Sequence, residues 1–268
     1  MLAPLAPATC QRAAPYLSAM TDKPCSLRFV QLNVNKSNTS QSALLHSIAD
    51  YDLVFLQEPH IDFLKNTRAS QQWRVIYPPR HKDSPSRTRS ITLINTRIAT
   101  NGWTAIPIDS PDITGVSLEY DTGVIHIFNI YNPQDSQLAL RALARATRTA
   151  CSGRDDHLDD PLVIWLGDFN RHHPAWEDEA NNHLLSERYL DAAQPLLDLL
   201  AAFDFHMLLP PRIPTLEAAN TKNHTRPDNI FASADIADCL VRCRTAPELR
   251  PPRTDHYPIV TELEVNVP

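Results

Sequence analysis

The sequence predicts a single α/β domain, and three observations support this prediction. The chain has 268 residues, 43% of them hydrophobic, which is enough for one large core. Short apolar runs that are typical of buried strands alternate with longer segments in which apolar residues recur at helical spacing. No repeat and no clear linker divides the chain. We therefore expect one domain over residues 26–268, after an Ala- and Pro-rich, disordered leader over residues 1–25, with two small domains as the alternative.

The first half of the chain begins with two strands joined by a helix. Residues 27–32 and 52–57 are apolar runs, and residues 40–49 carry an apolar stripe at helical spacing, with a Ser or Thr cap expected near position 39. Residues 78–90 then form a proline-rich basic loop. Four further strands follow it, at residues 91–94, 103–108, 113–120 and 124–130.

The second half continues the alternation of helices and strands. An Ala- and Leu-rich helix is expected over residues 138–150, and a longer one over residues 183–203 in which Pro195 marks a potential break. Between them, an apolar run bounded by Pro161 and Gly167 predicts a buried strand. The last two strands are expected at residues 228–231 and 257–265.

The strand before Gly167 ends on Asp168, Phe169 and Asn170. In extended backbone, Asp168 and Asn170 would point to one face and Phe169 to the other, so that a carboxylate and an amide would share a pocket. A polar turn that simply closes the strand is the alternative, because Gly, Asp and Asn are common in turns. The ends of the other strands favour the pocket.

Polar side chains that can bind metal or phosphate stand at the ends of six predicted strands. Four strands finish on such a residue and two begin after one: Asn33, Glu58, Tyr131, Asp168 with Asn170, Asp228, and Asp255 with His256. If these strands enter and leave a sheet at one edge, the side chains meet there. Carboxylate and amide oxygens without a thiolate favour Mg²⁺ or Mn²⁺ over zinc. With His256 available to bind phosphate or to move a proton, the set suits the hydrolysis of a phosphate ester.

Five motifs, in order, resemble the endonuclease/exonuclease/phosphatase superfamily, and most closely the endonuclease domain of LINE-type (non-LTR) retrotransposons. They are QEP at 57–59, NIYNP at 129–133, GDFN followed by RHHPAW at 167–176, RPDNIF at 226–231 and TDHYPI at 254–259. The resemblance covers nearly all of residues 27–265. It implies two packed, mostly antiparallel sheets flanked by helices in a four-layer sandwich, with the active site at one edge.

The resemblance also implies roles for the metal-side and phosphate-side residues. Glu58 matches the family's metal ligand, Asn33 its metal-side asparagine, and Asp255 a second metal-side carboxylate. Tyr131 matches the tyrosine that contacts the scissile phosphate. The remaining catalytic matches are Asp168, which activates the attacking water, Asn170 beside it on the phosphate, His256, which binds phosphate, and Asp228, which holds that histidine.

Three further residues are predicted to bind substrate. Thr215 is similar to a DNA-contacting threonine of the family, on a loose alignment. Arg89 belongs to the basic loop, which either holds DNA phosphates or is simply solvated. His172 has a structural or a DNA-facing role. The departures from the family pattern are Pro227 before Asp228, which restricts the backbone there, and Asn35 where several members carry an aspartate, which makes a second tightly bound metal less expected.

The resulting hypothesis is a Mg²⁺-dependent DNA endonuclease, with Mn²⁺ as a substitute metal, that nicks DNA and leaves a 3′ hydroxyl as a primer. A phosphatase of small esters and an inactive retrotransposon remnant are the alternatives. The net charge of −6 does not decide the substrate, and no apolar run approaches the ~20 residues that span a bilayer, so we expect no membrane partner. Five cysteines without metal spacing indicate an intracellular protein, and the resemblance implies nuclear access. No reverse transcriptase core is recognised in this sequence, and the oligomeric state stays open.

Overall fold

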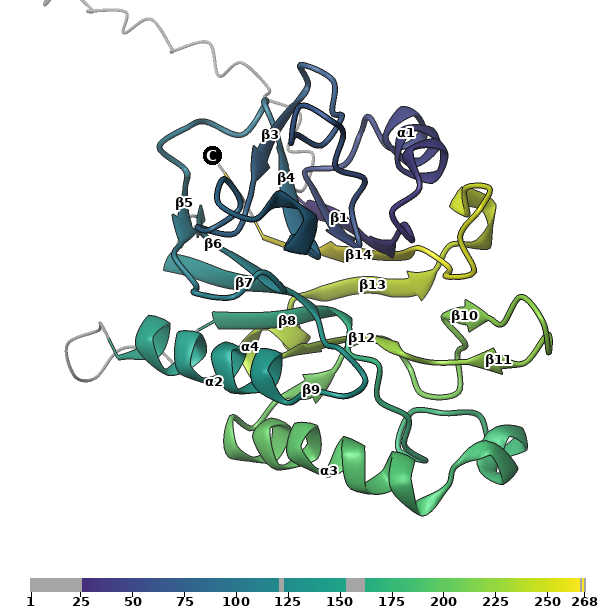
Figure 1. Ribbon diagram of the computed structural model, residues 1–268. Coiled ribbons are helices and arrows are strands. Elements are labelled where there is room, and N and C mark those ends of the chain that lie inside the picture. The colour runs from purple at the N-terminus through teal and green to yellow at the C-terminus, as the bar shows by residue number, and fades with distance from the viewer. Residues whose placement is uncertain (1–25, 121–122, 153–161, 266, 268) are drawn as a thin grey trace, which may run out of the picture.

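Two six-stranded β-sheets pack face to face and are covered on both outer sides by helices (Figure 1). The computed structural model describes residues 26–120, 123–152, 162–265 and 267. The predicted leader lies outside the described residues and stays a prediction. The predicted four-layer α/β sandwich of mostly antiparallel strands is confirmed.

The first sheet is mixed, with its strands in the order β13-β14-β1-β2-β4-β3. β1 and β2 run parallel, and the other neighbouring strands are antiparallel. Its strands are β1 (Leu27–Asn33), β2 (Leu53–Gln57), β3 (Trp73–Ile76), β4 (Ser90–Asn95), β13 (Leu240–Thr245) and β14 (Ile259–Leu263).

The second sheet repeats this design, with its strands in the order β5-β6-β7-β8-β12-β9. Here β7 and β8 are the parallel pair, and the remaining neighbours are antiparallel. Its strands are β5 (Trp103–Ile106), β6 (Ile113–Tyr120), β7 (Gly123–Tyr131), β8 (Leu162–Asp168), β9 (His206–Met207) and β12 (Asp228–Ala232).

The helices form the outer layers of the sandwich (Figure 1). α1 (Asn38–Ser47) packs on the first sheet, and α2 (Leu138–Cys151) and α3 (Glu187–Ala202) pack on the second. Shorter elements are α4 (Ala234–Asp238), the 3₁₀ turns η1 (Pro85–Arg87), η2 (Glu179–Leu184) and η3 (Pro247–Leu249), and the hairpin of β10 (Leu216–Glu217) with β11 (His224–Thr225). None of the helices in the described ranges is long and apolar enough to cross a membrane.

Side-chain alternation along the strands separates the core into layers, as β8 illustrates. Ile164 and Leu166 point into the space between the sheets, whereas Val163 and Trp165 point outward against α2 and α3. All four are buried, because both faces of the sheet are covered. This explains why β8 is a continuous apolar run in the sequence.

Two helices differ in detail from the sequence prediction. The cap of α1 is Ser37, whose hydroxyl accepts the N–H of Ser40 at 3.1 Å, so the helix begins two residues earlier than expected. α3 continues through Pro195 without a break. Ala193 and Leu196, on either side of this proline, are buried in the core next to the second sheet.

The strand directions explain why one edge of the sandwich collects the polar side chains. β1 and β2 are parallel, as are β7 and β8, so each pair ends at one edge of its sheet. β12 is antiparallel to β8 and therefore begins where β8 ends, with Asp228 opposite Asp168. β14 likewise begins beside the end of β1, with Ile259 opposite Gln31. We call this edge the polar edge.

Candidate active site

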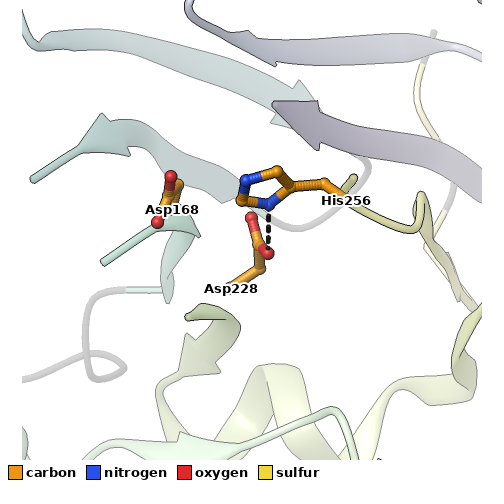
Figure 2. Close-up of side chains that lie close together, drawn as sticks. All are labelled: Asp168, Asp228 and His256. Atoms are coloured by element: carbon orange, nitrogen blue, oxygen red, sulfur yellow. Dashed lines mark hydrogen bonds and ion pairs between the residues drawn. The ribbon is translucent and has the colours of Figure 1, made fainter. Parts of the chain in front are cut away.

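Asp168, Asp228 and His256 form a buried cluster at the polar edge. Asp168 ends β8, Asp228 begins β12 opposite it, and His256 lies in the segment that enters β14. Figure 2 shows the imidazole above Asp228, with its second ring nitrogen turned toward the side on which Asp168 lies. One ligand atom from each residue lies within 4.8 Å of the others, so the three could hold a metal ion.

The carboxylate of Asp228 is fully buried, and hydrogen bonds engage both of its oxygens. Its Oδ2 accepts from Nδ1 of His256 at 2.8 Å and from the hydroxyl of Thr215 at 2.8 Å. Its Oδ1 accepts from the side-chain amide of Gln31 at 2.9 Å. A metal ion bound by Asp228 would compete with these donors, whereas the present arrangement fixes the orientation of the imidazole.

Pro227 does not disturb the pair of Asp228 and His256. It lies just before β12, where its missing N–H removes no ladder hydrogen bond. Its carbonyl accepts the N–H of Phe169 at 3.0 Å, which ties the start of β12 to the segment after β8. The backbone restriction expected from Pro227 is therefore compatible with the bond between Asp228 and His256.

The imidazole of His256 is stabilised in its charged form. Burial by itself lowers the pKa of an imidazole, but the charge and hydrogen bond of Asp228 outweigh it. With smaller contributions from Asp168 and Asp255, they raise the pKa of His256 to about 9. At neutral pH the ring is therefore a cation that can donate from both nitrogens.

For Asp168, in contrast, the surroundings disfavour the charged form, and this also raises its pKa. Burial is the largest cause and the charge of Asp228 the next, and together they raise the pKa of Asp168 to about 6. His256, the amide of Asn33 (2.9 Å to Oδ2) and the backbone N–H of Asn170 (3.0 Å to Oδ1) favour the ionised form and limit the rise. Asp168 is thus ionised at neutral pH, with a pKa suited to a general base.

The backbone after Asp168 is a tight turn, and the extended geometry expected at Asn170 is wrong. Asn170 has a φ of 48°, in the left-handed region that asparagine tolerates better than most residues. Its N–H turns back to the carboxylate of Asp168. Asn170 itself is half-buried and lies two residues after Asp168, at the end of β8.

Glu58 and Tyr131 form a second group at the same edge. Glu58 follows β2 with a φ of 45°, and its side chain is 17% exposed and 3.6 Å from the ammonium group of Lys36. Tyr131 ends β7, and its phenol lies close enough to Glu58 to interact with the charge of that carboxylate. Burial, followed by the charges of Glu58 and Asp168, raises the pKa of Tyr131, so its phenol stays protonated and able to donate.

Asn33 connects the cluster to the end of β2, where it lies opposite Gln57, and Asp255 lies beside His256. The amide of Asn33 donates to Asp168, and its Oδ1 accepts the N–H of Asn35 at 2.9 Å. The carbonyl of Asn33 accepts from the hydroxyl of Thr254 at 2.8 Å, which places Asp255 beside the end of β1. Oδ1 of Asp255 lies 3.8 Å from Nε2 of His256, and its side chain is 35% exposed.

Arg89 is built into the structure that supports Glu58 and Tyr131. Its Nε donates to Oδ1 of Asp112 at 2.6 Å, and its guanidinium lies 5.0 Å from the centre of the Tyr131 ring. The backbone joins the same groups, because the N–H of Glu58 donates to the carbonyl of Arg89 and that of Tyr131 to the carbonyl of Asp112, both at 2.8 Å. Arg89 therefore has a supporting role in addition to its charge.

Thr215 and His172 both make contacts within the protein. Thr215 is completely buried and donates to Asp228, so its hydroxyl supports the cluster, and the DNA contact predicted for it stays a prediction. His172 bonds through Nδ1 to the buried carboxylate of Glu177 at 2.6 Å and packs edge-on against Tyr189. Of the two roles left open for His172, its contacts favour the structural one.

The buried polar residues between the sheets that support the cluster were not identified from the sequence. Gln31 bonds Asp228 and also Gln57, and Gln57 in turn donates to Asn129 across the two sheets at 2.5 Å. A signal for Gln31 exists in the sequence, because it occupies a core-facing position two residues after Phe29 in an apolar strand. The link from Arg89 to Asp112, 23 residues away, has no comparable signal.

The sequence matches one protein-family model. Residues 125–260, half of the chain, match the model described as endonuclease-reverse transcriptase. The matched region begins in β7 and includes the whole cluster of Asp168, Asp228 and His256. None of the curated protein sequences matches this chain.

Solved structures with the same fold include three enzymes or enzyme domains. The endonuclease domain of TRAS1, a telomere-specific non-LTR retrotransposon, has a TM-score of 0.70 and 17% identity, over 88% of this chain and 98% of that domain. The AP endonuclease LMAP from Leishmania major has a TM-score of 0.69 and 14% identity, over 91% and 89%. The 3′ phosphatase NExo from Neisseria, bound to a product DNA hairpin, has a TM-score of 0.65 and 18% identity, over 88% and 99%. At these identities, the likeness shows a shared fold.

Proposed function

The chain belongs to the endonuclease-reverse transcriptase family, and we propose that it is a Mg²⁺-dependent endonuclease that nicks DNA. The observation that carries the proposal is the pairing of two unlike acid–base groups at the polar edge. A carboxylate of raised pKa, Asp168, lies beside a buried imidazolium, His256. Such a pair can take a proton from water while a cation balances charge on the phosphate. Its nuclear location is part of the same proposal.

Asp168 is the proposed general base. Hydrogen bonds from Asn33 and from the N–H of Asn170 hold its two oxygens and leave each with a further lone pair. A water molecule that donates to one of these oxygens would be aligned for in-line attack on phosphorus. The proton moves from that water to Asp168 as the new P–O bond forms and the bond to the leaving oxygen breaks.

His256, Tyr131 and Asn170 are the proposed phosphate-binding groups. Nδ1 of His256 is engaged by Asp228, so Nε2 is the nitrogen that can donate to a phosphate oxygen. The protonated phenol of Tyr131 and the side-chain amide of Asn170 supply further donors at the same edge. These donors stabilise the negative charge that builds on the oxygens during hydrolysis.

The proposed metal site is formed by Glu58, Asn33 and Asp255. Their oxygens fit Mg²⁺, a hard cation that binds carboxylate and carbonyl oxygens and keeps several waters. The partial exposure of Glu58 and Asp255 leaves room for those waters. When bound there, Mg²⁺ supplies charge that polarises the phosphate and neutralises the leaving oxygen.

Mg²⁺ is expected to raise the melting temperature of the protein, and Glu58→Gln is expected to abolish that rise. A ligand that binds only the folded state stabilises it by mass action, and each kcal/mol of stabilisation raises the melting temperature of a chain of this size by about 2–4 °C. Thermal melts at increasing millimolar Mg²⁺ measure this, with Glu264→Gln, a glutamate after β14, as the matched control. Equal shifts in wild type and Glu58→Gln would place the metal elsewhere.

The nicking rate is expected to follow a bell-shaped pH profile. Asp168 must be ionised, so the rate rises as the pH increases through about 6, the raised pKa of this group. His256 must be protonated, so the rate falls as the pH increases through about 9. Initial rates at saturating metal measure both limbs. A rate that does not fall in the alkaline range would remove the proposed role of the imidazolium.

The chemistry of the nicked end tests the proposal against its alternatives. A 3′ hydroxyl is extended by a DNA polymerase without prior phosphatase treatment, and this is the expected result. Neisseria NExo, which has the same fold, is described as a 3′ phosphatase, so release of phosphate from a 3′-phosphorylated end is the competing result. Turnover of small phosphate esters without action on DNA would instead support the small-ester phosphatase.

A further inference from the structure

A groove runs beside the proposed active site on the outside of the sandwich. It encloses about 700 Å³ and lies between the segment that leads into β4, the loop between β5 and β6, and the start of α2. Four basic side chains line it, from three separate parts of the chain: Lys36, Arg87, Arg89 and Arg145. We call it the basic groove.

The basic groove is continuous with the polar edge. Lys36, which lines it, lies 3.6 Å from the carboxylate of Glu58. Arg89, also in its lining, lies over the ring of Tyr131. Pro133, two residues after Tyr131, lines the groove as well. A DNA strand whose phosphate is bound at Tyr131 can therefore continue directly into the basic groove.

The acidic residues of the groove are already neutralised by arginines. Asp112 pairs with Arg89 at 2.6 Å, and Asp109 pairs with Arg80 at 2.8 Å. In contrast, within the described part of the chain, the exposed side chains of Arg87 and Arg145 form no hydrogen bond or ion pair. The groove thus presents two guanidinium groups that are free to bind anions.

We propose that the basic groove binds the DNA strand next to the cleaved bond, with phosphates held by Arg87 and Arg145. The proposal rests on the proposed function for its substrate, and it adds where the flanking strand lies. Arginine forks match two phosphate oxygens at once, and two such groups in one groove suit a repeating polyanion better than a single small phosphate. The exposed Leu138 and Pro111 in the lining offer apolar contact to sugars.

The test measures DNA binding separately from cleavage. The protein carries Asp168→Asn in every sample, so that a short duplex is not cut, and binding is followed by fluorescence anisotropy at increasing salt. Adding Arg87→Ala and Arg145→Ala is expected to weaken binding at least tenfold. Each lost phosphate contact reduces the slope of log K against log salt by about 0.9, so the slope is expected to fall by about two.

Two controls keep the result specific. Arg242→Ala removes an exposed arginine from β13, at the opposite edge of the first sheet from β4, and is expected to leave affinity and slope unchanged. Arg87→Lys with Arg145→Lys keeps both charges and is expected to keep the slope. If the variant with Arg87→Ala and Arg145→Ala binds DNA with the same affinity and salt slope as Asp168→Asn alone, the proposed role of the basic groove is wrong. If binding falls as expected while the wild type cuts no DNA, the groove stands and the nuclease proposal fails.

Discussion

Asp168→Asn is expected to lower the rate of DNA nicking by about 10²–10⁴-fold, the usual contribution of a general base. The asparagine side chain has nearly the same shape and can still accept from Asn33 or from the N–H of Asn170. It cannot take a proton from water at neutral pH. The substitution therefore removes the proposed chemistry while it leaves the surroundings in place, and initial rates on supercoiled plasmid measure the loss.

Stability distinguishes this loss of chemistry from a loss of folding. Because the pKa of Asp168 is raised in the folded state, the fold disfavours the ionised form, and that cost is present above pH 6. The neutral amide avoids it, so Asp168→Asn is expected to melt at or above the wild-type temperature at pH 8. Asp198→Asn, in an exposed part of α3, is the matched control and should nick at the wild-type rate. Nicking by Asp168→Asn within threefold of wild type would contradict the assignment.

His256→Asn is expected to reduce nicking by about 10²–10³-fold, the typical effect of removing one donor to a developing oxyanion. An asparagine amide can occupy the place of Nδ1 and keep the bond to Asp228, whereas it has no counterpart to Nε2 and no charge. The alkaline limb of the pH profile should disappear with it. Truncation to alanine is a poorer probe, because it also removes the hydrogen bond to the buried carboxylate of Asp228 and is expected to destabilise the protein more.

The proposed dependence of His256 on Asp228 can be measured with a double-mutant cycle. If Asp228 acts by orienting and charging the imidazole, then Asp228→Asn combined with His256→Asn should be little slower than the slower single variant. Losses that multiply would show that the two residues act independently. Comparison of kcat with KM adds a second criterion, because a group that acts on the transition state lowers kcat.

Much of the fold was predictable because the central strands are buried on both faces. β2 and β8 are continuous apolar runs up to their last residues, and β1 and β7 are mostly apolar; the polar residue at or just after the end of each strand marks the edge where the site forms. β13 gave no such signal, because it is an edge strand in which Val241 and Arg242 are exposed. β9 has two residues, too short for any periodicity.

The site was predictable in its residue types but not in its connections. The meeting of Asp168, Asp228 and His256 follows from the order of the strands, and it is seen in the structure. The turn at Asn170 and the burial of Thr215 beneath Asp228 depend on tertiary contacts between segments that are distant in sequence. Spacing along the chain carries no information on such contacts, so a resemblance could suggest a role for Thr215 but not its position.

The polar edge is proposed to hydrolyse DNA phosphodiesters with a metal ion. Conversion of supercoiled plasmid to open circle by the purified wild-type protein tests it most directly, with Mg²⁺ and again after chelation with EDTA. We expect open circles with Mg²⁺, none after chelation, and recovery when Mg²⁺ is restored. A folded wild-type protein that leaves the plasmid supercoiled with both Mg²⁺ and Mn²⁺, or that nicks it equally well in EDTA, would contradict the account.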